Sequence, residues 1–197
     1  MYIIVIMMWV GFAFIHSLLI DFRFSAWTGR LLGRYYAFYR IFYNLLSILL
    51  FMTFQKYTKS LDKKFVIKFV PPWTILQYGL IIFSCLIILW AFLSYDPLEF
   101  IGIRQIKEIR EKNTLPKTIT DKGLLGIVRH PMYLATIVLM WSLNSTRIDI
   151  MVHTILTGYI LIGIRLEEKK LVKQFGLSYM IYQKKIPALI PFIRRVK

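Results

Sequence analysis

The chain has 197 residues, of which 57% are hydrophobic and 16% aromatic, and its formal net charge is +16. This apolar content is too high for a soluble domain of this length, so it predicts an integral membrane protein. One Cys and three scattered His exclude an intramolecular disulfide and offer no metal-ligand cluster, so we expect no metal site. The positive charge indicates attraction to anionic lipid headgroups rather than a nucleic-acid partner.

Apolar segments predict about five transmembrane helices, because a helix needs about 20 apolar residues to cross the hydrocarbon core. The predicted helices cover residues 2–20, 36–54, 73–95, 131–143 and 148–164. The fourth would be about 20 Å long, so it is either shallow or extended by its flanks. The first has no basic leader and no cleavage site, and we interpret it as a retained helix. The predicted fold class is therefore an all-α integral membrane protein.

Lys and Arg residues concentrate in segments that an outside N-terminus would leave in the cytoplasm. These segments hold most of the 26 basic residues, within the ranges 23–40, 104–129 and 165–197. Since basic residues near helix ends are retained inside, we predict a cytoplasmic C-terminus in a membrane such as the bacterial inner membrane. The Lys-rich segment 56–68 would lie outside and fits this rule least well.

The chain is predicted to have two parts. Residues 1–95 contain three transmembrane helices, and residues 96–197 contain a loop, a transmembrane hairpin and a cytoplasmic tail. The loop is long and polar, as functional loops often are, and residues 104–112 within it are expected to form a short basic helix on the membrane surface.

The tail after residue 164 has apolar residues about one helical turn apart, which predicts a helix. Gly176 is expected to interrupt that helix, and Pro187 and Pro191 to end regular helical structure. Together the hairpin and the tail are predicted to form the functional site.

Two polar motifs flank the predicted hairpin. Arg129, His130 and Pro131 precede its first helix, while Glu167 and Glu168 follow its second helix. Charged residues near the middle of the hairpin mark its turn. Because the chain crosses the membrane and returns, both motifs are expected on one face, where they would form a composite site.

The first motif has two interpretations. Pro131 fits the first turn of a helix, which places Arg129 and His130 at the helix N-terminus. Free N–H groups and a partial positive charge at that end suit a carboxylate or phosphate of a ligand. In the alternative, both side chains extend to lipid headgroups.

The acidic pair also has two interpretations. Glu167 and Glu168 lie beside Arg165 and two Lys, which is typical of a solvated cluster of helical ion pairs. In the functional interpretation, one carboxylate accepts hydrogen bonds from a ligand and the other pairs with Arg165. The first motif across the hairpin favours the functional one. His16 and His153 lie in apolar runs and are interpreted as interior packing residues.

The order and spacing of these residues resemble a known group. The pattern is Gly126-x-x-Arg129-His130-Pro131-x-Tyr133, then Glu167-Glu168-x-x-Leu171-x-x-x-Phe175-Gly176-x-x-Tyr179-x-x-Tyr182. It resembles the C-terminal half of the isoprenylcysteine carboxyl methyltransferase and phospholipid methyltransferase superfamily. Three N-terminal segments are similar to the NnrU-type branch, which includes methanethiol S-methyltransferase: His16-Ser17-Leu18-Leu19, Tyr39-Arg40-x-Phe42-Tyr43-Asn44 and Asp96-Pro97-x-x-Phe100-x-Gly102-x-Arg104-Gln105.

This resemblance implies a membrane enzyme that transfers a methyl group from S-adenosylmethionine, which binds on the cytoplasmic side. The implied cofactor-binding residues are Gly126, His130, Pro131, Tyr133, Glu167, Glu168 and Tyr182. A cofactor with a carboxylate, an ammonium and a sulfonium needs donors, acceptors and aromatic faces, and this set contains all three. Methyl transfer by in-line displacement needs no protein nucleophile, and the sequence offers no evident one.

The predicted acceptor is a small thiol such as methanethiol. A positive charge from Arg129 or Arg165 would hold the thiolate, which is the reactive form. Alternatives are a lipophilic acceptor, either an isoprenylcysteine carboxylate or a phospholipid amine, and a non-catalytic membrane scaffold or sensor. A reductase-like relative is less favoured, because the sequence has no Gly-x-Gly-x-x-Gly fingerprint. The chain is shorter than expected for a methanethiol enzyme, and Leu134 stands where a small residue is usual.

Overall fold

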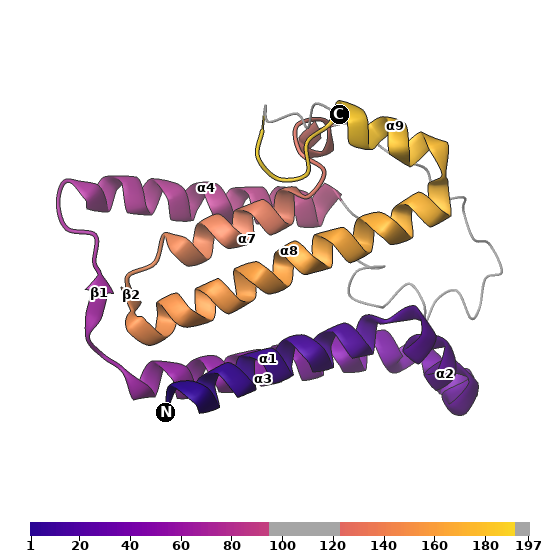
Figure 1. The fold of residues 1–197 in the computed structure, drawn as a ribbon, viewed down its shortest axis with the longest axis horizontal. Coiled ribbons are helices and arrows are strands. Elements are labelled where there is room, and N and C mark those ends of the chain that lie inside the picture. The colour runs from indigo at the N-terminus through magenta and orange to yellow at the C-terminus, as the bar shows by residue number, and fades with distance from the viewer. Residues whose placement is uncertain (95–122, 192–197) are drawn as a thin grey trace. The chain divides into compact units, whose positions relative to one another are not determined.

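The computed structural model describes residues 1–94 and 123–191, and they are predominantly helical (Figure 1). The described elements are α1 (Tyr2–Ile20), α2 (Phe22–Leu32), the 3-10 helix η1 (Gly33–Phe38), α3 (Tyr39–Leu61), β1 (Phe65–Ile67), α4 (Trp73–Ser94), the 3-10 helix η2 (Gly123–Gly126), α7 (Pro131–Trp141), β2 (Ser145–Thr146), α8 (Arg147–Phe175) and α9 (Leu177–Lys185). The predicted surface helix 104–112 lies outside the described residues.

The described chain forms two compact units. One contains residues 1–66 and 145–156, and the other contains residues 67–94, 123–144 and 157–191. The first part of α8 belongs to one unit and the remainder to the other. The predicted functional division after residue 95 stays a prediction.

Aromatic side chains between α1 and α3 form the core of the first unit. Trp9 is fully buried, and its ring packs edge to face on Phe12 and Phe51 with centroids 5.8 and 5.3 Å apart. Trp9 Nε1 donates to Thr58 Oγ1 at 3.1 Å, which satisfies the polar atom of the indole. These contacts fix α1 along α3.

The chain after α1 continues as a second helix. Asp21 caps α2, because its Oδ1 accepts hydrogen bonds from two backbone N–H groups at 2.9 and 3.2 Å. Gly33, with a φ of +52°, follows α2 in a conformation that favours glycine. The third helix, α3, begins at Tyr39 and ends at Leu61, so it extends beyond the predicted range 36–54 at its C-terminal end. Hydropathy underestimates the length of this helix because its last turns are polar.

A capping box begins α8. Thr146 N donates to Asp149 Oδ2 at 2.9 Å, and Asp149 N donates back to Thr146 Oγ1 at 3.2 Å. Lys59 Nζ forms an ion pair with Asp149 Oδ2 at 2.9 Å. Arg147 and Asp149 therefore lie in the first turn of α8, directly after the connection from α7. The short strands β1 and β2 pair beside this cap, a small addition to the all-helical expectation.

Both histidines of the apolar runs lie inside the first unit. His16 is half-buried, and its Nδ1 lies 2.9 Å from Ser47 Oγ. His153, one turn after Asp149, is buried. These positions agree with the interpretation of both as packing residues.

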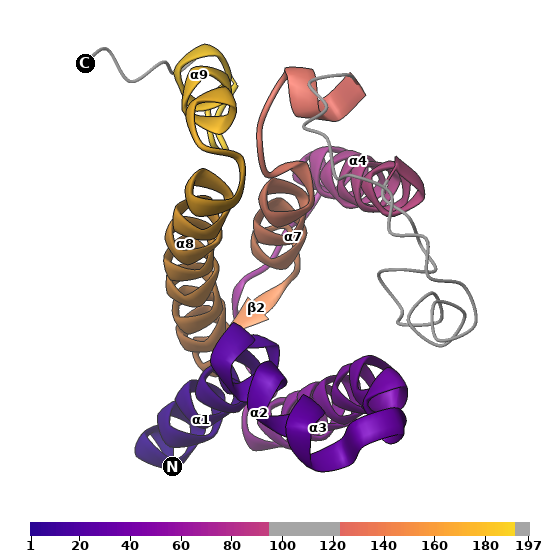
Figure 2. The same ribbon diagram turned by 90° about the vertical axis from the view of Figure 1, so that its right-hand side faces the viewer.

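In the second unit, α4 and α7 pack side by side (Figures 1 and 2). Gln77 of α4 is buried and donates from Nε2 to Ser142 O at 3.0 Å, just beyond the end of α7. The same amide lies 3.3 Å from Asn144 Oδ1. Because α7 is fixed along α4, the position of its N-terminus, which carries the first polar motif, is fixed too.

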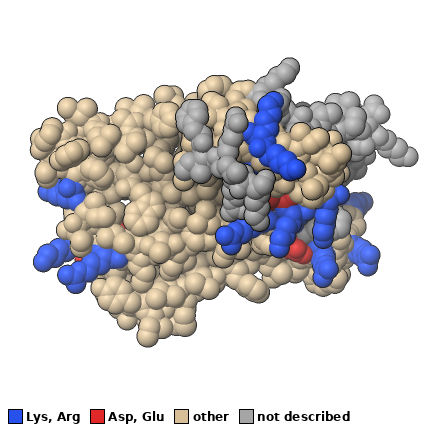
Figure 3. Space-filling view, turned by 45° about the horizontal axis from the view of Figure 1, so that its top comes forward, with Lys and Arg blue, Asp and Glu red and all other residues tan. Residues whose placement is uncertain are grey.

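Four described helices are long and apolar enough to cross a membrane. They are Tyr2–Ile20, Arg23–Leu61, Trp73–Leu93 and Arg147–Phe175. The helix α7 has 11 residues and a length of about 16 Å, so the fourth predicted span, 131–143, is present as a short apolar helix. On the face drawn in Figure 3, Lys and Arg side chains gather in groups, and most of the other coloured atoms belong to uncharged residues. The count of five spans and the orientation stay predictions.

The predicted helical tail is confirmed. The helix α8 continues past residue 164 to Phe175, and Gly176, with a φ of +57°, separates it from α9. The last helix ends at Lys185, before Pro187. Charged residues with good helix propensity continue α8 after its apolar part ends.

Candidate active site

The first polar motif is joined to the C-terminal segment through the backbone. Arg129 N donates to Pro187 O at 2.9 Å, and His130 N donates to Ala188 O at 3.0 Å. Pro131 is the first residue of α7, as expected from its missing N–H. These two N–H groups at the start of α7 therefore bind carbonyls of the chain itself, and not a ligand.

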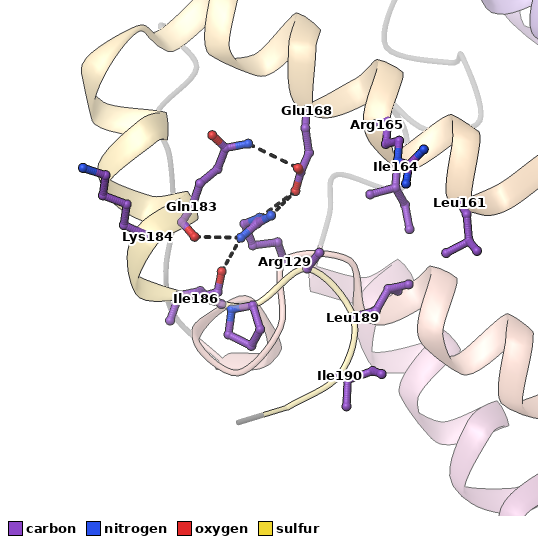
Figure 4. Close-up of a pocket in the computed structure, with 12 residues that line it drawn as sticks. Arg129, Leu161, Ile164, Arg165, Glu168, Gln183, Lys184, Ile186, Leu189 and Ile190 are labelled. Carbon is purple, nitrogen blue, oxygen red and sulfur yellow. Dashed lines mark hydrogen bonds and ion pairs between the residues drawn. The ribbon is translucent and has the colours of Figure 1, made fainter. Parts of the chain in front are cut away.

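The Arg129 guanidinium connects three segments (Figure 4). Its Nε donates to Glu168 Oε1 at 2.7 Å, and its Nη2 donates to the same oxygen. Its Nη1 donates to Gln183 O at 3.0 Å and to Ile186 O. The side chain is only 8% exposed. The sequence suggested that a carboxylate pairs with Arg165, but in the structure the partner of Glu168 is Arg129.

His130 lies between the two carboxylates. Its Nε2 is 3.3 Å from Glu168 Oε1, and its Nδ1 is 3.8 Å from Glu167 Oε2. The imidazole stacks on the Tyr133 ring with centroids 5.5 Å apart, and Tyr133 Oη donates to Glu167 Oε2 at 3.0 Å. The two motifs thus meet across the hairpin, as the sequence predicted.

The helix α9 contributes two further side chains to this network. Gln183 Nε2 donates to Glu168 Oε2 at 3.2 Å, and Tyr182 Oη donates to Leu125 O at 2.6 Å. Gly126 is the last residue of η2, directly after Leu125. Tyr179 is buried beside Tyr182. Burial, together with the nearby negative charge of Glu168, raises the pKa of Tyr179 to about 12, so this phenol stays neutral near pH 7.

A cavity of about 470 Å³ lies beside the Arg129–Glu168 pair. Its lining residues are Arg129, Leu161, Ile164, Arg165, Glu168, Gln183, Lys184, Ile186, Pro187, Ala188, Leu189 and Ile190. The lining combines three cationic side chains, one carboxylate and one amide with an apolar wall. Such a surface suits a ligand that carries both charged and apolar parts.

The predicted site residues take two kinds of position. Arg129, Arg165 and Glu168 line the cavity. The others are not among the lining residues, although His130 contacts Glu168 and Tyr133 contacts Glu167: Gly126, His130, Pro131, Tyr133, Glu167 and Tyr182.

Sequence reasoning missed several lining residues. It did not single out Gln183, Lys184 or, apart from Pro187, the residues of segment 186–190. Their only signal was the pair of prolines at positions 187 and 191, which marks a segment outside helices.

The fold and the site define a helical membrane protein whose last hairpin and tail enclose a charged pocket. Similar proteins indicate which kind of membrane protein this is. A methanethiol S-methyltransferase of Pseudomonas deceptionensis is 35% identical over 111 residues, which cover 55% of this chain and 42% of that protein. Another, of Crocosphaera subtropica, is 28% identical over 193 residues, which cover 92% of this chain and 71% of that protein.

A more distant relative is the protein-S-isoprenylcysteine O-methyltransferase of Xenopus laevis, 33% identical over 87 residues, 41% of this chain and 29% of that protein. No protein-family profile matches the chain, and no solved structure does. The match to the Pseudomonas relative spans less than half of that protein's length. These homologues confirm the resemblance to the superfamily of isoprenylcysteine and methanethiol methyltransferases.

Proposed function

We propose that the chain is a membrane methyltransferase that transfers a methyl group from S-adenosylmethionine to a small thiol such as methanethiol. One observation carries the proposal: two motifs far apart in the sequence join through Arg129 and Glu168 beside a cavity with mixed charge. The names of the homologues support the reaction class and the thiol.

The lining of the cavity fits the proposed cofactor. Its volume of about 470 Å³ falls within the range of roughly 300–1,000 Å³ that is usual for small-molecule sites. Glu168 and Gln183 offer oxygen acceptors for an ammonium or for ribose hydroxyls, while Lys184 offers a cation for a carboxylate. His130 contacts both carboxylates, and Tyr133 Oη donates to Glu167, so these two side chains help to hold the carboxylates in place.

The residues of the chain have positioning roles in the proposed reaction. When bound, S-adenosylmethionine would supply a methyl group from its sulfonium. The thiolate sulfur would bond to this methyl group by in-line displacement, and the electron pair of the broken C–S bond would stay on the cofactor sulfur. Arg165, which lines the cavity from α8, would favour the thiolate over the thiol and hold it. Leu161, Ile164 and Leu189 would exclude water, which strengthens that electrostatic attraction.

The topology belongs to the same proposal. We place the N-terminus outside and the C-terminus in the cytoplasm of a bacterial inner membrane, with α7 as the short fourth of five spans. The segment 165–185 then carries its basic residues on the cytoplasmic side, where the cofactor is available.

A lipophilic acceptor is the second candidate. The apolar part of the cavity wall and the isoprenylcysteine enzyme among the relatives favour it. The acceptor would then be an isoprenylcysteine carboxylate or a phospholipid amine, and the cofactor site would be the same.

Titration calorimetry of S-adenosylmethionine into the detergent-purified protein tests the cofactor. We expect micromolar binding, followed by methyl transfer to methanethiol in a product assay. Transfer only to prenylcysteine or phospholipid would replace the thiol by the second candidate. A folded protein without detectable binding would contradict the enzyme and favour a non-catalytic scaffold.

Substitution at the network tests the site. We expect Glu167→Gln and His130→Ala each to weaken cofactor binding by at least about tenfold, or roughly 1.4 kcal/mol. Arg165→Gln should leave cofactor affinity nearly unchanged but reduce turnover of the thiol. The matched control is Lys173→Gln, which removes an exposed charge of α8 away from the cavity and should change neither quantity. Wild-type cofactor affinity in both network variants would exclude this site.

A further inference from the structure

One wall of the cavity is a segment without regular secondary structure. Residues 186–190 follow α9 and contribute five consecutive side chains or backbone groups to the lining. No helical or strand hydrogen-bond pattern fixes a segment of this kind, so its position depends on contacts from other parts of the chain.

Two adjacent residues supply most of the described hydrogen bonds to this segment. The backbone N–H groups of Arg129 and His130 bind the carbonyls of Pro187 and Ala188. The Arg129 side chain binds the carbonyl of Ile186, and also that of Gln183 in the turn before it. Residues 129 and 130 thus bind three carbonyls of the wall and one carbonyl of α9.

The guanidinium of Arg129 is itself held by Glu168. Nε and Nη2 both donate to Glu168 Oε1, while Nη1 donates to the two backbone carbonyls. All three nitrogens of the guanidinium therefore have partners inside the protein, and its charge is compensated by a carboxylate. Arg165 differs, since its side chain is exposed and lines the same cavity from α8.

We propose that Arg129 is a positioning residue that latches segment 186–190 onto α8, and that the cation which meets the acceptor anion is Arg165. The first part concerns the structure alone, and the second rests on the proposed function. The planar fork of an arginine suits this role, because its three nitrogens spread the donors between the Glu168 carboxylate and the two carbonyls, whereas all donors of an ammonium share one nitrogen. Arg129 therefore affects cofactor binding by fixing the segment 186–190, and it does not contact the transferred methyl group.

Hydrogen exchange of the free protein tests the latch without any cofactor. Arg129→Lys keeps the charge but loses the fork, so we expect exchange of the amides in 186–190 to rise by at least about tenfold, with α4 and α7 unchanged. Arg165→Lys is the matched control on the same cavity and should leave this exchange as in the wild type. Unchanged exchange in Arg129→Lys would overturn the latch.

Kinetics separate the latch from a contact with the acceptor. In Arg129→Lys we expect cofactor affinity to fall by at least about tenfold, while kcat at saturating cofactor and thiol stays within about threefold of the wild type. Arg165→Gln should show the reverse, with lost thiol turnover and retained cofactor affinity. Normal affinity with lost kcat in Arg129→Lys would instead mean that Arg129 touches the acceptor.

A second variant covers the case in which Arg129→Lys does not fold. Ala188→Gly leaves Arg129 and all its acceptors in place and only adds backbone freedom to the wall. We expect faster exchange in 186–190 and a cofactor affinity about two- to fourfold weaker, with kcat unchanged. Wild-type exchange in this variant would contradict the dependence on an ordered wall. If the wild-type protein binds no cofactor, the proposed function fails while the exchange comparison still decides the latch.

Discussion

The helix α8 carries a carboxylate paired with a basic side chain near each end, yet the two pairs differ in what surrounds them. Asp149 is bound mainly by its own helix cap, through the backbone N–H and the hydroxyl of Thr146, with Lys59 as the ion-pair partner. Glu168 is bound by Arg129, His130 and Gln183, which come from distant parts of the sequence.

The difference in surroundings distinguishes the ion pair of Asp149, which is structural, from that of Glu168, which belongs to the candidate site. A carboxylate whose partners are its own helix cap and one lysine fixes the start of a helix and needs no cavity. A carboxylate that binds side chains from two other segments fixes these segments to α8 beside a cavity, here of about 470 Å³. An ion pair between a carboxylate and a basic side chain thus stabilises one end of α8, and a second ion pair of this kind organises the proposed binding site near the other end.

The largest expected effect is at the Glu168 end. Glu168→Gln keeps the shape of the side chain but leaves the nearly buried Arg129 guanidinium without its carboxylate. Since hydrogen bonds to charged groups contribute about 1.5–3 kcal/mol, we expect cofactor affinity to fall by about tenfold to one hundredfold. Titration calorimetry measures this loss, and a change below about twofold would remove Glu168 from the site.

The corresponding substitution of Asp149, near the start of α8, should change the stability of the fold and leave cofactor affinity unchanged. Asp149→Asn weakens the capping box and the ion pair, and we expect the free energy of unfolding to fall by about 1–2 kcal/mol. Thermal unfolding in detergent measures it, and cofactor affinity should not change. Arg147→Gln, an exposed neighbour, is the control for the lost charge. A loss of cofactor affinity in Asp149→Asn would show that the two ends are coupled.

A smaller effect is expected for the hydroxyl that binds Glu167. Tyr133→Phe removes one hydrogen bond of 3.0 Å but keeps the ring that stacks on His130. We expect cofactor binding to weaken by about 0.5–1.5 kcal/mol, less than for Glu168→Gln. Calorimetry on both variants gives the order, and a larger loss in Tyr133→Phe would make Glu167 the dominant carboxylate.

The smallest effect should appear only at high pH. The pKa of Tyr179 is raised to about 12, so the unfolded chain loses this proton near pH 10 while the folded protein retains it. The contribution is fully present below about pH 10, and stability falls as pH rises from about 10 to 12. Tyr179→Phe should make this fall shallower, as measured by unfolding temperatures of both proteins at several pH values. Parallel curves would contradict the raised pKa.

Local patterns predicted the helices with different success. The predicted ranges 2–20 and 73–95 agree closely with α1 and α4, because these helices are apolar to both ends. The ranges 36–54 and 148–164 stop short of α3 and α8. Hydropathy detects the part of a helix that lies in lipid, whereas helix propensity and capping decide where the helix ends.

The site was predicted in part for a similar reason. Both polar motifs were found because charged residues next to apolar helices are conspicuous in a sequence. The pairing of Glu168 with Arg129 was not predicted, since the sequence offered Arg165, a near neighbour on the helix, as the partner of one carboxylate, whereas Arg129 approaches from another segment. The wall 186–190 was missed because its residues have no periodic pattern.

The sequence by itself determined the membrane class, the helical hairpin and the two motifs, because apolar length, helix propensity and proline position act within a few turns of the chain. Only the tertiary structure decided that Arg129 binds Glu168 and the carbonyls before Pro187, and that Arg165 lines the cavity. These pairings join residues up to 57 positions apart. Which groups meet across such separations depends on the packing of whole helices and on side-chain direction, and neither is encoded in local spacing.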